Sequence, residues 1–101
     1  MTRREIQAWL QQRRPAPPEA LQRHLEAAVA ESEERLPDHL AETGAALLRQ
    51  VTQASDRGRD VALDLLAADA FITYAFEAQA EADVAGLDSL AMRVAQAEGV
   101  A

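Results

Sequence analysis

The chain has 101 residues, with 17 acidic side chains against 10 basic ones and a net charge of −7. It contains neither cysteine nor lysine, which excludes disulfides, thiolate nucleophiles, zinc–sulfur sites and Schiff-base chemistry. The negative charge disfavours nucleic acid as a partner, and no apolar run approaches the roughly 20 residues of a membrane span. We expect one small domain of a bacterial cytoplasmic protein, without a signal peptide.

Residues 1–14 are predicted to form a basic amphipathic helix. The pattern T-R-R-E that begins at Thr2 is a capping box, and the helix should run to about Gln12. Its apolar stripe consists of Ile6, Trp9 and Leu10. Residues 15–18 hold three prolines and predict a stiff connector, after which residues 19–101 should form a helical bundle.

The next two helices are separated by the proline at position 37. The first is predicted over residues 19–36, because Leu21, Leu25, Ala28, Val29, Ser32 and Leu36 fall on one face. The second begins at Pro37 and Asp38, with a stripe of Leu40, Gly44, Leu47, Leu48 and Val51. Glycine within such a stripe costs about 1 kcal/mol relative to alanine, which predicts close approach of a neighbouring helix there. Residues 55–58 predict a turn.

Residues 60–82 predict a long helix with two apolar faces. One face consists of Val61, Leu65, Ala68, Ile72, Ala75 and Phe76, and the other of Leu63, Ala67, Ala70, Phe71, Tyr74 and Ala78. A helix that is apolar on two sides is central in its domain or is shared with a partner. A last helix, from about Asp88 to Ala97, completes an all-α, antiparallel bundle of four to five helices.

The pentapeptide Gly-Leu-Asp-Ser-Leu, from Gly86 to Leu90, resembles the signature of acyl and peptidyl carrier proteins around their modified serine. The resemblance implies a phosphopantetheine arm on Ser89, with Asp88 beside it at a helix N-terminus. Carrier domains place this serine near their middle, whereas only residues 90–101 follow it here, and residues 91–95 lack the acids of a recognition helix. The preferred interpretation is a helix cap formed by Asp88 or Ser89.

Other polar constellations give weak indications of chemistry. His39 and Glu42 have helical spacing but lack the further ligands of a di-metal site, so a surface histidine is preferred. The long helix is predicted to carry an acidic strip along one edge, formed by Asp69, Glu77 and Glu81, with Asp64 on another side. We expect this strip to be solvated or paired with the N-terminal arginines; catalysis would need a buried carboxyl facing a cleft.

The N-terminal helix has three potential docking sites. It can fold back on the chain's own acidic long helix, dock on a second copy or another protein, or lie on an anionic membrane. The first fits the charges, and the last is the weakest because three anchors on one short helix bind poorly.

These patterns predict a protein-interaction module, homodimeric, with no catalytic activity, cofactor or metal. The expected partner-binding residues are Ile6, Trp9, Leu10, Leu63, Phe71 and Tyr74. The alternative is a carrier or sensor that binds a small apolar ligand between helices, in a pocket lined by Trp9, Tyr74 or Phe76.

Overall fold

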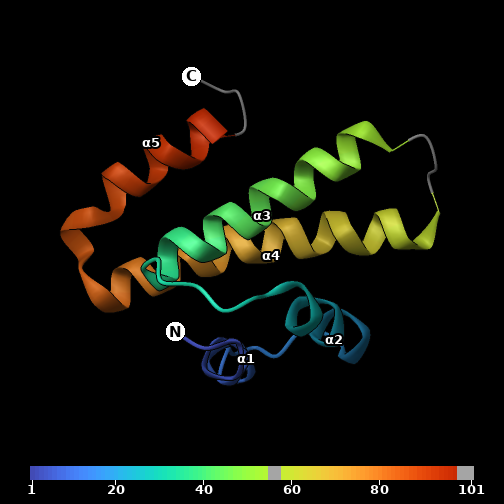
Figure 1. Cartoon of the computed structure of the whole chain (residues 1–101), viewed down its shortest axis with the longest axis horizontal. Helices are drawn as coiled ribbons and strands as arrows, with labels where there is room; N and C mark the ends of the chain where they lie inside the picture. The colour runs from blue at the N-terminus through green and yellow to red at the C-terminus, as the bar shows by residue number, and fades with distance from the viewer. Residues whose placement is uncertain (55–57, 98–101) are drawn as a thin grey trace.

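The computed structural model describes residues 1–54 and 58–97 and shows a small all-α bundle, as predicted (Figure 1). The helices are α1 (Arg3–Gln11), α2 (Glu19–Ala28), α3 (Leu36–Gln53), α4 (Arg59–Ala82) and α5 (Leu87–Ala97), with a 3-10 turn, η1 (Val84–Gly86), before α5. The turn predicted at residues 55–58 falls mostly outside the described residues. No helix in the described part of the chain is long and apolar enough to cross a membrane.

The capping box at Thr2 forms as predicted. The Thr2 hydroxyl accepts a hydrogen bond from the Glu5 backbone N–H at 3.1 Å, and the Glu5 carboxylate accepts one from the Thr2 N–H at 2.8 Å. The hydrogen bond that the Thr2 backbone N–H donates to the carboxylate, followed by the interaction with the Thr2 side chain, holds the pKa of Glu5 below its usual value. The N-terminus of α1 is therefore fixed by residues that adjoin it in sequence.

The second helix is shorter than predicted, because it ends at Ala28 and Val29 adopts an extended backbone. The N-terminal segment takes up the backbone groups that the helix would have used. Arg3 Nε donates to the Val29 carbonyl at 3.0 Å, while Ser32 and Met1 bond reciprocally through their backbones, at 2.7 and 3.1 Å. The prediction of a helix to Leu36 was wrong, because the backbone groups of Val29 and Ser32 bond to Arg3 and Met1 at the N-terminus of the chain.

Helices α3 and α4 form a long antiparallel hairpin in close contact at Gly44. A methyl group on Gly44 would lie 3.0 Å from Ile72 Cδ1 and 3.1 Å from the Ala68 carbonyl oxygen. It would also lie 3.1 Å from Phe71 Cβ. The close approach predicted from the glycine in the apolar stripe is confirmed, and it explains why a helix-destabilising residue occupies this position.

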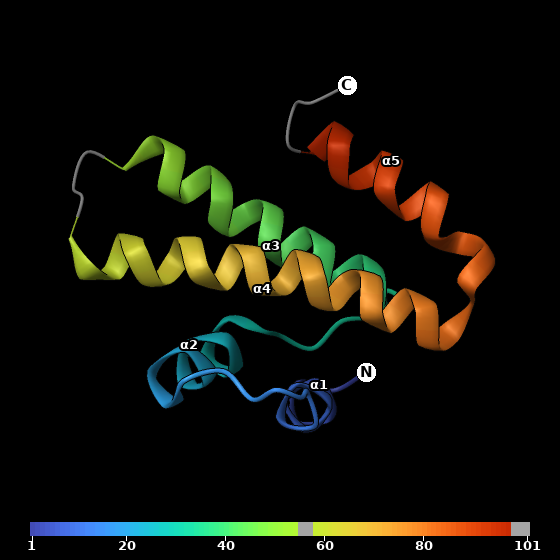
Figure 2. The same cartoon turned by 180° about the vertical axis from the view of Figure 1, so that it is seen from behind.

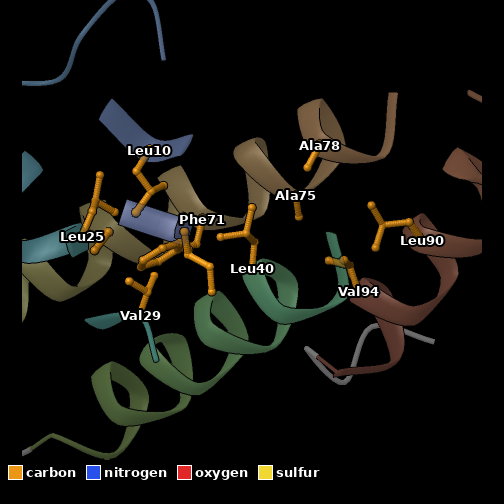
Figure 3. Packing of buried hydrophobic residues seen from close by; sticks show 11 residues of the cluster. Leu10, Leu25, Val29, Leu40, Phe71, Ala75, Ala78, Leu90 and Val94 are labelled. Carbon is orange, nitrogen blue, oxygen red and sulfur yellow. The ribbon is translucent and has the colours of Figure 1, made fainter. Parts of the chain in front are cut away.

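The core forms where helices from both halves of the chain meet on α4. Phe71 is fully buried and lies beside Leu10, Leu25 and Val29, as Figure 3 shows. Toward the C-terminal end of α4, the buried Ala75 and Ala78 leave room for the buried leucine and valine of α5, Leu90 and Val94 (Figure 3).

The remaining helices lie on opposite sides of the α3–α4 hairpin (Figures 1 and 2). α1 and α2 lie on one side. α1 is seen nearly end-on in the views in which α4 lies in the plane, so α1 and α4 cross. α5 lies on the other side, near the end of the hairpin where α4 finishes. The part of the hairpin near the α3–α4 connection extends beyond α5.

Candidate functional site

The seam between α1 and α4 is a small polar and aromatic cluster. The rings of Trp9 and Tyr74 meet edge to face, with centroids 6.1 Å apart, and the Arg13 guanidinium lies 3.7 Å from the centre of the indole ring. Trp9 Nε1 donates to the Glu81 carboxylate at 3.1 Å. Arg13 pairs with Glu81 at 3.0 Å and with Glu77 at 3.4 Å.

The charges of this seam complement each other. The hydrogen bond from Arg13, followed by that from Trp9, holds the pKa of Glu81 below its usual value. The basic N-terminal helix thus folds back on the acidic long helix of its own chain, which is the first of the three destinations expected for it. The pairing of the acidic strip with an N-terminal arginine is confirmed for Glu77 and Glu81.

Three of the residues expected to bind a partner are instead in the core. Ile6 and Leu10 are 1% exposed, and Phe71 is 0% exposed. Trp9 and Tyr74 are half-buried against each other, and Leu63 is half-buried. The second apolar face of α4 is therefore covered over Phe71 and Tyr74 by α1 and α2 of the same chain, which corrects the expectation that a second copy shields it there.

The remaining acids on α4 divide between pairing and exposure. Asp64 lies 2.7 Å from the Nε2 atom of His24, so this pair joins α2 to α4. Asp69 is exposed. Because neither carboxyl lies in a buried cleft, the arrangement gives no support to acid–base catalysis by these residues.

The α3–α4 hairpin carries an apolar surface that the sequence patterns do not predict. Leu65 and Leu66 are 50% and 54% exposed, although Leu65 had been placed on a face expected to be covered. Beside them is a hollow of about 170 Å³, lined by Leu48, Leu65, Ala68, Asp69 and Ile72. We call these six residues together the hairpin patch. Helical periodicity places residues on a face of a helix but does not show which part of that face a neighbouring helix covers.

A second hollow lies between the N-terminal half of α3 and α5. It has a volume of about 440 Å³ and is lined by Glu34, Arg35, Asp38, Ala41, Glu42, Leu90, Arg93, Val94 and Ala97. We call it the α3–α5 cleft. None of the aromatic residues expected to line a ligand pocket contributes to either hollow. No sequence pattern predicts the cleft, because the cleft exists only where α5 folds back beside α3.

The serine of the carrier-like pentapeptide is exposed in the first turn of α5. Helix α5 begins at Leu87, so neither Asp88 nor Ser89 precedes it as a cap, and the predicted cap role was wrong. Asp83 caps this region instead, where its carboxylate accepts from the Ala85 N–H at 3.1 Å.

The histidine considered as a metal ligand, His39, is half-buried on α3, and burial lowers its pKa. Within residues 1–54 and 58–97, no group of three or more potential metal-ligating side chains is close enough to hold an ion.

Comparison with models of protein families, with curated proteins and with solved structures found no match for this chain. The assignment of a role therefore depends on the surfaces described above.

Proposed function

We propose that the protein is a small interaction module that forms a homodimer through the hairpin patch. The observation that carries the proposal is the pair of consecutive leucines, Leu65 and Leu66, each at least half exposed beside an apolar hollow. Single exposed leucines are ordinary on protein surfaces, whereas a contiguous apolar patch with a concave part is typical of an interface.

The shape of the patch favours a second copy of the chain as its partner. A two-fold interface is formed by the same surface on both subunits, so a projecting side chain must lie close to a recess that accepts it. Leu66 is exposed on α4 and adjoins in sequence Leu65, which lines the hollow together with Ile72. Burial of the exposed parts of the two leucines contributes about 1 kcal/mol for each residue, and symmetry doubles the sum.

The net charge opposes this association in a measurable way. Two copies that each carry a charge of −7 repel one another, and dissolved salt screens that repulsion. The dimer should therefore become tighter as ionic strength rises, unlike a complex that is stabilised by ion pairs.

Sedimentation equilibrium over protein concentrations up to about 1 mM tests the proposal. We expect a monomer–dimer equilibrium in the native chain and a monomer in Leu66→Glu, whose circular dichroism stays native because the side chain is exposed. The matched control is Met92→Glu, which adds the same charge at an apolar residue of α5 that is 65% exposed. This control should still dimerise.

Two outcomes would contradict the proposal. A native chain that stays monomeric at the highest concentration and at high salt excludes the dimer. Equal dissociation by Leu66→Glu and Met92→Glu would show that added charge, and not the hairpin patch, governs association.

A further inference from the structure

The α3–α5 cleft has the size and place of a small-molecule site. Its volume of about 440 Å³ falls within the range of about 300–1,000 Å³ found for ligand pockets, which in helical bundles lie between helices. The cleft lies between α3 and α5. It shares no residue with the hairpin patch.

The floor of the cleft is apolar. Leu90 and Val94 come from one face of α5 and are 0% and 9% exposed, while Ala41 and Ala97 complete the lining from α3 and α5. Small alanine side chains leave the space that larger residues would fill. The accessible apolar surface of the cleft comes mainly from Ala41, Val94 and Ala97, and an apolar body in this space would remove that surface from water.

The rim carries charges that are only partly compensated. Arg93 of α5 pairs with Asp38 of α3 at 2.8 Å, so these two charges neutralise each other across the cleft. Glu34 and Glu42 lie beside one another, and among the described residues neither has a cationic side chain within ion-pair distance. Arg35 also lines the rim without pairing to either carboxylate.

The proximity of Glu34 and Glu42 has an electrostatic cost. The neighbouring Glu42 carboxyl, through a hydrogen bond to the protonated form and through charge repulsion, raises the pKa of Glu34. A cation placed between the two carboxylates would remove that repulsion. A divalent metal fits poorly, because no third ligating side chain joins the pair within the described residues.

We propose that the α3–α5 cleft binds a small amphiphilic organic cation. Its ammonium or guanidinium head lies between Glu34 and Glu42, and its apolar body lies over Ala41, Val94 and Ala97. The geometry selects for both parts together, since an apolar molecule without charge gains nothing from the rim and an anion meets three carboxylates against two guanidinium groups.

Titration of the ¹⁵N-labelled protein with n-octylammonium, n-octanol and octanoate tests this selectivity by amide chemical shifts. The three probes share a tail length and differ in the charge of the head. We expect saturable shifts for n-octylammonium at Ala41, Leu90 and Ala97, with affinity about tenfold higher than for n-octanol and weaker binding still for octanoate. Equal affinity for the three probes, or shifts that do not saturate, would overturn the proposal.

Two pairs of variants locate the two parts of the ligand. The double variant Glu34→Gln, Glu42→Gln should lower the affinity for n-octylammonium to that for n-octanol. Its control is Glu19→Gln, Glu31→Gln, which removes the same charge at exposed residues outside the cleft and should bind as the native chain does.

The second pair concerns the apolar body. Ala97→Trp should fill the cleft and abolish binding of all three probes, whereas Ala91→Trp, at an exposed position of α5 outside the cleft, should leave it intact. Unchanged binding in Ala97→Trp, or in the double glutamine variant, would refute the assignment. Leu66→Glu should bind normally, because this inference does not depend on dimerisation.

Discussion

Replacement of Gly44 by alanine sets two effects of known sign against each other. Alanine favours the helical backbone of α3 by about 1 kcal/mol relative to glycine. The added methyl group, however, would lie 3.1 Å from both the Ala68 carbonyl oxygen and Phe71 Cβ. Neither atom can rotate away, because one belongs to the backbone and the other is attached to it, so α3 and α4 must separate by a few tenths of an ångström.

Overpacking of this kind costs about 1–3 kcal/mol, which outweighs the gain in helix propensity. We therefore expect Gly44→Ala to lower the free energy of unfolding by about 1 kcal/mol and the melting temperature by about 4–8 °C. Urea denaturation followed by circular dichroism measures the free energy of unfolding of Gly44→Ala and of a control variant. The control is Ala46→Gly on the same helix, where the change should show only the propensity cost of about 1 kcal/mol.

The third contact at this point, Ile72 Cδ1 at 3.0 Å, belongs to the end of a flexible side chain. The double variant Gly44→Ala, Ile72→Val should thus be more stable than the sum of the single changes predicts, because valine lacks that atom. A rise in stability of about 1 kcal/mol in Gly44→Ala alone would refute the reasoning, since it would mean that the helices are not in close contact there.

Two further predictions concern the core and the dependence of stability on pH. Phe71→Ala should lower the free energy of unfolding by about 3–5 kcal/mol, because a fully buried ring is lost from the core between α1, α2, α3 and α4. Met92→Ala is the exposed control, and equal effects of the two would contradict the burial. Burial lowers the pKa of His39 in the folded chain, so below its unfolded value of about 6.5 the unfolded chain binds more protons and stability falls with falling pH. Denaturant unfolding between about pH 7.5 and 5.5 should show this loss, and His39→Gln should reduce it; an unchanged slope in that variant would contradict the assignment.

Much of the fold follows from local patterns. The capping box at Thr2, the start of α3 at Leu36 with Pro37 in its first turn, and the long helix over residues 59–82 all depend on residues that are near in sequence. The close contact at Gly44 could also be predicted from the sequence, because an unfavourable residue inside an apolar stripe requires a compensating contact.

The errors arise where distant segments compete with local preference. Val29 and Ser32 continue the helical spacing of α2, but their backbone groups bond to Met1 and Arg3, which no periodicity can indicate. Phe71 illustrates the same limit at the level of function. The position of Phe71 on a second apolar face predicted that another surface covers it. Whether that surface belongs to the same chain or to a second molecule depends on how α1 and α2 fold back.

Trp9 is the chain's single tryptophan, and it lies where α1 meets α4, with a guanidinium over its ring and Glu81 as its hydrogen-bond acceptor. Its fluorescence therefore monitors the attachment of one short helix separately from the total helical content. Emission that changes ahead of the far-ultraviolet signal would reveal a species in which α1 has detached while the hairpin persists. Simultaneous changes would show that a contact spanning 72 positions of sequence unfolds together with the rest.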